Sequence, residues 1–354
     1  MLKSIDLFSG GGGLSEGMKQ AGFDIVSAVE LDPTAADTFR CNHPSTNVIE
    51  RDIRYVAGDE ILKPNKLVKG ELDLLAGCPP CQGFSALTRK YNKDDARNSL
   101  IKEVTRLITE LEPKSLMIEN VPGMMTKGKP FLDEFLRAIK KLGYIANFDV
   151  LQVADYGVPQ DRRRFVLLAG KGFEIKLPKP THSKDGGNGL LKWKTVSQAL
   201  NGLDEPISLS RAKSYGGPQK FNWHIVRDIS ELNIERFKFL KPGGSRFDIP
   251  EHLRPDCHKG NSLGFSNFYG RMSWNDVSPT ITGGCTAPSK GRFGHPDKLR
   301  TISVREAARL QTFPDSYKFS TNFIDHACKV IGNALPCEFA RKMSEACYVA
   351  VNGN

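Results

Sequence analysis

The sequence predicts an α/β protein, a Rossmann-like, doubly wound and mostly parallel sheet with a second, smaller and loop-rich domain. Short apolar runs alternate with stretches of helical periodicity through the first half of the chain, as in a parallel sheet with crossover helices. After Gly170 this pattern gives way to loop-rich sequence, with interleaved basic and aromatic residues, that continues to about Gly294. At 354 residues the chain also exceeds the usual size of one domain.

Individual elements follow from local signals. Asp32 is expected to cap a helix whose first position is Pro33. Helical periodicity returns in SVREAARLQ, and a last helix over about Pro336–Val349 is apolar enough to pack on the first domain. Besides a short strand before Asp52, the expected strands lie at 3–8, 24–29, 72–77, 115–120, 144–153 and 165–170, and the expected helices at 14–21, 33–41, 99–111 and 131–142.

The composition favours an intracellular protein with a polyanionic partner. Lys and Arg number 50 against 40 Asp and Glu, a formal net charge of +10. We expect a cytoplasmic, nucleoid-associated protein, because the sequence has no apolar run of membrane-spanning length and no signal-peptide core. The eight cysteines are then expected to be free thiols. Only Cys78 and Cys81 have CxxC spacing, so a four-cysteine zinc site is not predicted.

A glycine-rich turn, DLFSGGGGLSEGM, joins the first strand to the first helix and would let a ligand approach the backbone at a helix N-terminus. Gly10 and Gly12 fit the spacing of a dinucleotide site, but Ser15 stands where its third glycine belongs. Glu30 could accept from both ribose hydroxyls of an adenosine cofactor, and Asp52 from an adenine amino group. The alternative interpretation is a glycine turn with two surface acids.

The stretch GCPPCQGFS places Cys81 after a predicted strand, at the sheet edge where open α/β sheets bind ligands. The prolines before Cys81 restrict the backbone, which favours an aimed nucleophile. A thiol needs cationic neighbours or a base to ionise near neutral pH.

Two further segments could supply polar groups to such a nucleophile. QDRRRF carries Gln160, Arg162 and Arg164, although a solvated basic turn would look the same. Glu119 ends the strand SLMIEN and could hydrogen-bond or protonate a ring nitrogen of a substrate, or simply cap a helix.

The chain resembles the cytosine-C5 DNA methyltransferases of bacterial restriction-modification systems, in the family's motif order: DLFSGGGGLSEGM, VELD, RDI, GCPPCQGFS, ENVPG, QDRRRF, REAARLQTFPDSY and GNALP. The resemblance implies the S-adenosylmethionine-dependent methyltransferase fold. It also implies S-adenosyl-L-methionine as cofactor, S-adenosyl-L-homocysteine as product, double-stranded DNA as substrate and no metal. The implied reaction begins with attack of Cys81 on C6 of a flipped-out cytosine, and methyl transfer to C5 follows.

The same resemblance assigns roles residue by residue. The implied catalytic residues are Cys81, Glu119, Arg162 and Arg164. Those implied to bind the cofactor are Phe8, Gly10, Gly12, Glu30, Leu31, Asp52, Ile53, Pro80, Leu100 and Asn333. Those implied to contact DNA are Gln82, Ser85, Gln160, Arg271 and Thr280. Cys78 has no implied catalytic role and is expected to be a packed thiol.

The resemblance also implies the domain limits. Residues 1–180, completed by 322–354, would form the catalytic and cofactor-binding domain. Residues 181–304 would form the target-recognition domain, with base-reading side chains between Ser210 and Arg271, and 305–321 a hinge that holds motif IX. We expect a monomer, with any companion restriction endonuclease acting independently.

Three other functions are less well supported by the residues. A tRNA methyltransferase of the same family typically has Pro-Phe-Thr after the catalytic Cys-Gln, whereas this chain has Gly83-Phe84-Ser85. A CxxC redox protein would be a small thioredoxin-like domain with no need of Glu119. A DNA-binding protein without catalysis would be expected to have lost Cys81, Glu119 or the arginines.

Overall fold

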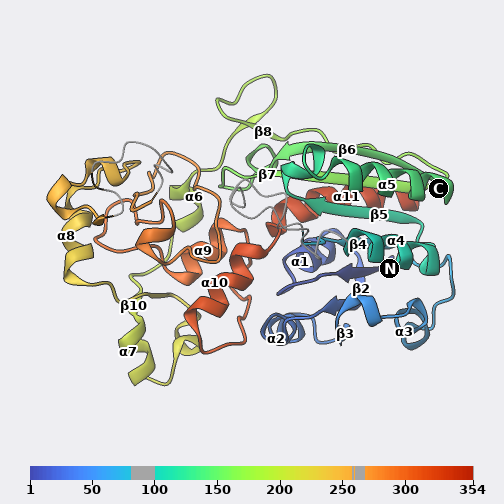
Figure 1. Cartoon of the computed structure of the whole chain (residues 1–354), viewed down its shortest axis with the longest axis horizontal. Helices are drawn as coiled ribbons and strands as arrows, with labels where there is room; N and C mark the ends of the chain where they lie inside the picture. The colour runs from blue at the N-terminus through green and yellow to red at the C-terminus, as the bar shows by residue number, and fades with distance from the viewer. Residues whose placement is uncertain (81–99, 257–258, 260–267, 354) are drawn as a thin grey trace. The chain divides into compact units, whose positions relative to one another are not determined.

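The computed structural model describes residues 1–80, 100–256, 259 and 268–353. The chain divides into two compact units (Figure 1). Unit 1 consists of Met1–Tyr156, Arg163–Thr181 and Leu335–Asn354, and unit 2 of Gly157–Arg162 and His182–Ala334. The predicted domain limits differ from these units, since 157–162 and 322–334 belong to unit 2, Thr181 belongs to unit 1, and the predicted hinge 305–321 lies within unit 2. The predicted roles of the domains stay predictions.

A seven-stranded sheet in the order β3-β2-β1-β4-β5-β7-β6 forms the centre of unit 1. Neighbouring strands are parallel, except that β7 runs antiparallel to both β5 and β6. This confirms the mostly parallel sheet predicted from the sequence. The strands are β1 (Lys3–Leu7), β2 (Asp24–Glu30), β3 (Asn47–Glu50), β4 (Leu74–Gly77), β5 (Ser115–Asn120), β6 (Tyr144–Gln152) and β7 (Arg163–Lys171).

Helices cover both faces of this sheet. Because side chains alternate between faces along a strand, Leu116 and Ile118 of β5 join the core with α3, α4 and α5, whereas Met117 meets Ser344 of α11. The apolar residues of α4 recur every three or four positions, as on one helical face. The helices of unit 1 are α1 (Gly13–Gln20), α2 (Pro33–Asn42), α3 (Gly58–Leu62), α4 (Leu100–Leu111), α5 (Lys129–Lys141) and α11 (Cys337–Asn352).

The last helix returns to the first part of the chain, as predicted. α11 packs against α1, β5 and β7. Gly17 makes the close approach of α1 possible, because a Cβ atom there would lie 2.4 Å from the Cβ of Ala340. The predicted cap of α2 is also confirmed, since the Asp32 carboxylate accepts from the backbone N–H groups of Thr34 and Ala35.

Unit 2 has short elements and long irregular connections. Two pairs of two-residue strands, β8 with β9 and β10 with β11, are its strand pairings among the described residues. Its strands are β8 (His182–Ser183), β9 (Leu191–Lys192), β10 (Ile207–Ser208) and β11 (Ile225–Val226), and its helices are α6 (Val196–Leu200), α7 (Leu209–Ser214), α8 (Glu231–Phe239), α9 (Val304–Leu310) and α10 (Ile324–Asn333). None of the helices described in either unit is long and apolar enough to cross a membrane.

Candidate active site

The predicted site residues of unit 1 gather at one edge of the sheet. β1, β2, β4 and β5 are parallel, so their carboxyl ends meet at this edge. Glu30 and Glu119 lie at the ends of β2 and β5, and the glycine turn follows β1. The turn that leads toward Cys81 follows β4, where the Cys78 N–H donates to the carbonyl of Leu7 over 3.3 Å.

The Glu30 carboxylate organises the glycine turn. One of its oxygens accepts from the N–H of Gly10 at 2.7 Å, and the other from those of Leu31 and Asp32 at 2.9 and 2.8 Å. Phe8, Gly10 and Gly12 all have positive φ angles, of 59°, 55° and 89°, so the turn is tightly coiled. Each carboxylate oxygen can accept more than one hydrogen bond, so Glu30 can hold the turn and still receive ribose hydroxyls.

The same turn has features that fit a bound cofactor. Nothing lies within 4 Å of the position that a Cβ atom of Gly10 would take, which leaves open space beside the backbone. Asp6 Oδ1 and Ser9 Oγ are buried without a hydrogen-bond partner among the described residues. Buried polar atoms normally have partners, so orphaned ones indicate a missing donor or acceptor.

Further residues predicted to bind the cofactor lie at the ends of β2 and β3. Leu31 is 64% exposed directly after β2, where an apolar ring could cover it. Ile53 is buried and begins a short 3-10 helix that Asp52 caps. The Arg54 side chain bonds to the Asp52 carboxylate and lowers the pKa of that carboxyl. Asp52 is thus held as a charged acceptor.

Glu119 and Arg164 form an ion pair at the end of β5. Antiparallel pairing of β5 with β7 places Glu119 opposite Val166, so that Arg164 reaches the carboxylate from the start of β7. Arg164 Nε lies 2.8 Å from Glu119 Oε1, and both side chains are largely buried. Burial lowers the pKa of Arg164 while the Glu119 charge opposes this effect. The sequence prediction brought these two residues to one site, and the structure places them in contact.

The turn before Cys81 is tied to the same strand end. Asn120 Nδ2 donates to the carbonyl of Pro79 at 3.0 Å, and Asn120 Oδ1 accepts from the N–H of Val121. Burial, together with the nearby charges of Glu119 and Asp6, raises the pKa of the Cys78 thiol. Cys78 is therefore a neutral thiol at neutral pH. The role of Asn120 in holding this turn was not predicted from the sequence. Cys81, Gln82 and Ser85 lie outside the described residues.

Three other residues are predicted to bind the cofactor. Pro80 is half-buried after the Pro79 carbonyl that Asn120 holds, and Leu100 begins α4. Asn333 is exposed at the end of α10 in unit 2.

Arg162 and Gln160 of the QDRRRF segment bond within unit 2. Arg162 is 5% exposed and donates to the carbonyls of Ile281, Gly332 and Ala334 at 3.1 to 3.3 Å. Gln160 is fully buried, and its side chain accepts from the Ile281 N–H. The contacts of both residues with DNA or a base stay predictions, and the described bonds hold the backbone of unit 2.

Arg271 and Thr280 also bond within unit 2. Arg271 is 3% exposed, and its guanidinium donates to the carbonyls of Phe237, His295, Pro296 and Lys298. That inward orientation gives no support to a role in reading bases. Thr280 is half-buried and donates to the carbonyl of Asp161 at 2.7 Å.

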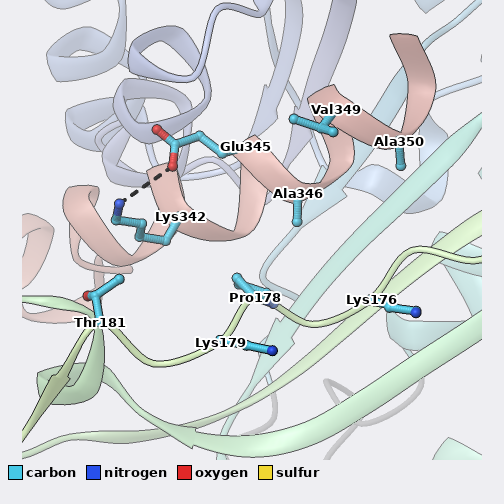
Figure 2. Close-up of a pocket in the computed structure, with 9 residues that line it drawn as sticks. All are labelled: Lys176, Pro178, Lys179, Thr181, Lys342, Glu345, Ala346, Val349 and Ala350. Carbon is cyan, nitrogen blue, oxygen red and sulfur yellow. Dashed lines mark ion pairs between the residues drawn. The ribbon is translucent and has the colours of Figure 1, made fainter. Parts of the chain in front are cut away.

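A surface pocket of about 470 Å³ lies elsewhere in unit 1, between α11 and the segment 176–181 (Figure 2). Ala346, Val349 and Pro178 contribute apolar surface, and Lys342 pairs with Glu345 at 3.7 Å. None of the predicted site residues lines this pocket. The predicted site residues of unit 1 lie instead at the carboxyl ends of the strands.

The protein has the fold of the S-adenosylmethionine-dependent methyltransferases. This follows from the order of the strands, the single reversed strand β7 and the acid, Glu30, that binds the glycine turn. A DNA modification methyltransferase encoded within an E. coli prophage has a similar solved structure, with a TM-score of 0.76 and 26% identity over 99% of this chain and 100% of that one. The Dnmt2 methyltransferase of S. pombe, at 17% identity, has a similar fold, with a TM-score of 0.66 over 100% of this chain and 99% of that one.

Residues 2–348 match the model of the C-5 cytosine-specific DNA methylase family, and the chain belongs to that family. Type II methylase M.HgiDII of Herpetosiphon aurantiacus is 37% identical over 350 residues, which cover 97% of this chain and 94% of that protein. Type II methyltransferase M.XorII of Xanthomonas oryzae pv. oryzae is 33% identical, over 95% and 82% of the two chains. The protein is thus a DNA methyltransferase that acts on C5 of cytosine, as the motif order predicts.

Proposed function

We propose that the carboxyl edge of the sheet in unit 1 methylates a flipped-out cytosine through a covalent bond from Cys81 to C6. The observation that carries this proposal is the buried Glu119–Arg164 pair, because it supplies a fixed carboxylate beside the turn that leads to Cys81. Cytosine C5 is a weak nucleophile, and addition of a thiolate at C6 makes it enamine-like. The base must leave the DNA stack for the thiolate to reach C6.

Glu119 has the central role toward the base. In its protonated form the side chain would donate to N3 from one oxygen and accept from the exocyclic amine of cytosine at the other. A proton then moves toward N3 as the thiolate adds, which offsets the negative charge that develops on the ring. Arg164 would keep that carboxyl group oriented through the bond from its Nε to Oε1. Once C5 has been methylated, loss of its proton expels Cys81 and restores the aromatic ring.

The cofactor would lie on the glycine-turn side of this edge. Glu30 would accept the ribose hydroxyls, with Leu31, Asp52 and Ile53 toward the adenine. The backbone of Phe8, Gly10 and Gly12 would lie along the remainder of the cofactor. When bound, S-adenosylmethionine supplies an electrophilic methyl group on a sulfonium.

We also propose that unit 2 carries the target-recognition region of a monomeric enzyme that modifies double-stranded DNA without help from an endonuclease. The net charge of +10 supports a polyanionic substrate. Bisulfite sequencing of DNA from a methylation-free host that expresses the protein would identify the target sequence.

Trapping with 5-fluorocytosine tests the role of Cys81. After methyl transfer, fluorine remains at C5, and no proton can leave to expel the thiolate. DNA with 5-fluorocytosine at the target position should therefore form a denaturant-resistant complex that needs S-adenosylmethionine to accumulate. Cys81→Ser should abolish both the complex and turnover, because a serine hydroxyl ionises far less readily than a thiol.

Cys78→Ser is the matched control, since this residue lies three positions away and is a neutral thiol. It should keep both the complex and turnover. A complex that persists in Cys81→Ser but disappears in Cys78→Ser would show that the nucleophile is misassigned. Absence of a complex with the wild-type enzyme would contradict the covalent mechanism.

A further inference from the structure

Asp6 is a buried carboxyl group that the proposed mechanism does not use. It is the penultimate residue of β1, directly before the glycine turn, and it is fully buried. Oδ2 accepts from the hydroxyl of Ser15, in the first turn of α1, at 2.7 Å. Oδ1 has no hydrogen-bond partner among the described residues. A buried carboxyl with one oxygen lacking a hydrogen-bond partner is costly, which indicates that a bound group offsets this cost.

The charged groups around Asp6 are themselves acidic. β1 pairs with β2 on one side and β4 on the other. From the end of β2, the Glu30 carboxylate acts on Asp6, and burial with this repulsion raises the pKa of Asp6 to about 7. From the turn after β4, the Cys78 thiol interacts with Asp6, and Ser15 of α1 contributes a hydroxyl. Among the described groups acting on Asp6, none is a cation.

Asp6 lies on the strand between the two proposed sites. Glu30 marks the proposed ribose site, and Cys78 adjoins Glu119 at the proposed cytosine site. The sulfur of the cofactor must lie between its ribose and the cytosine, because the methyl group on that sulfur has to reach C5. Asp6 is paired with Ala28 of β2, two residues before Glu30, and with Ala76 of β4, two residues before Cys78. It therefore lies on the strand between the two sites.

We propose that Asp6 is a specificity-determining residue that favours the positively charged methyl donor over its neutral-sulfur product. S-adenosylmethionine carries a sulfonium charge that S-adenosylhomocysteine has lost, while the two share the ribose, the adenine and the amino-acid group. A carboxylate beneath the glycine turn attracts that extra charge through a medium with little screening. The proposal rests on the proposed function, and it predicts that product release is assisted by loss of this attraction.

Proton release gives a readout that is independent of turnover. The sulfonium stabilises the ionised form of Asp6, so binding of the methyl donor at pH 6.5 should drive a proton from the protein into the buffer. The product lacks that charge and should release a smaller fraction of a proton. Calorimetric titrations in two buffers of different ionisation enthalpy measure this number for each ligand.

The experiment compares wild type with Asp6→Asn and Glu30→Gln, titrated with donor and with product. Asp6→Asn keeps the shape and an oxygen for Ser15, and it should lower the donor-to-product affinity ratio on the order of tenfold and abolish the difference in proton release. Glu30→Gln should weaken both ligands alike, because both contain the ribose. An unchanged ratio in Asp6→Asn, beside a Glu30→Gln that weakens both ligands, would overturn the role of Asp6 alone. A wild-type protein that binds neither ligand would overturn the proposed function as well.

Ser15→Ala provides a second test if Asp6→Asn does not fold. It removes the one hydroxyl that donates to the carboxylate and leaves the charge in place. The donor-to-product ratio should be retained, and the donor-linked proton release should extend to higher pH, because Asp6 then holds its proton more tightly. Donor-linked release that is the same in Ser15→Ala and wild type at every pH would contradict the assignment of the proton to Asp6.

Discussion

In unit 1 a largely buried arginine pairs with a carboxylate, whereas three buried arginines of unit 2 bond backbone carbonyls. In unit 1, Arg164 pairs with the Glu119 carboxylate at a strand end. In unit 2, the guanidinium of Arg162 donates to three carbonyls, that of Arg271 to four, and that of Arg305 to the carbonyls of Asn222, Pro314 and Tyr317. Arg162 and Arg164 are two residues apart in the sequence, yet they have these different partners.

The difference follows from how the backbone N–H and C=O groups of each unit find their hydrogen-bond partners. The strands of the seven-stranded sheet pair their own N–H and C=O groups, so side chains at its edge remain available for chemistry. The long irregular segments of unit 2 leave buried carbonyls that need donors from elsewhere. Arginine offers five N–H donors in one rigid group, which suits several carbonyls at once. Some of the arginines that contribute to the positive charge, and so to the prediction of a nucleic-acid partner, therefore stabilise the interior of unit 2.

Glu119→Gln should have the largest effect, and it acts on chemistry. We expect the rate of methyl transfer at saturating substrates to fall by about 10²- to 10⁴-fold, because the amide cannot transfer a proton to N3 and leaves the negative charge on the ring uncompensated. Initial rates with labelled methyl donor measure this. Glu134→Gln, at an exposed acid of α5, is the matched control and should be silent. A Glu119→Gln enzyme within a few-fold of wild type would exclude the proposed role.

Arg271→Met should act on stability. Loss of the guanidinium leaves four carbonyls without this donor, and we expect the free energy of unfolding of unit 2 to fall by about 3 kcal/mol. Trp193, Trp223 and Trp274 are the tryptophans of the chain, and all belong to unit 2, so their fluorescence in urea reports on this unit. Arg211→Met, at an exposed position, should change the midpoint little. Equal effects of the two variants would show that the inward bonds contribute nothing.

Asp6 in unit 1 and His295 in unit 2 should change the free energy of unfolding with pH in opposite directions. In unit 1 the folded state raises the pKa of Asp6 to about 7, so between about pH 4 and 7 it holds a proton that the unfolded chain has lost. This contribution to stability is full at low pH and declines as the pH rises to 7, by at most about 1.4 kcal/mol per pH unit. The difference in unfolding free energy between wild type and Asp6→Asn, followed by circular dichroism from pH 5 to 7.5, should show this slope. A constant difference would contradict it.

His295 should act in the other direction in unit 2, over a smaller range. Burial lowers the pKa of His295 to about 4, and its Nδ1 accepts from the N–H groups of Asp297 and Lys298. The unfolded chain takes up a proton near pH 6.5, so stability from the neutral ring is present above that value and is lost as the pH falls toward 4. The urea midpoints of wild type and His295→Asn, measured by tryptophan fluorescence, should become more similar as the pH is lowered. Midpoints that diverge instead would rule out this role.

Sequence alone determined the mostly parallel sheet and the order of its elements along the chain, and it predicted the edge at which the site is proposed. Alternation of apolar runs with helical periodicity depends on local spacing, and capping by Asp32 depends on neighbours in the chain, so both could be predicted. Glu30 and Glu119 were placed at strand ends by the same local pattern. The motif order then identified the family and with it the reaction.

Tertiary structure decided which partners the polar side chains found. The bond from Gly10 N–H to Glu30 spans 20 residues, and that from Asn120 to Pro79 spans 41. Arg271 was predicted to contact DNA, yet it points inward, because carbonyls 24 to 34 residues away in the chain converge on it. An arginine in an irregular segment looks the same in sequence whether it meets a phosphate or a carbonyl. Only the fold determines which of these acceptors is near.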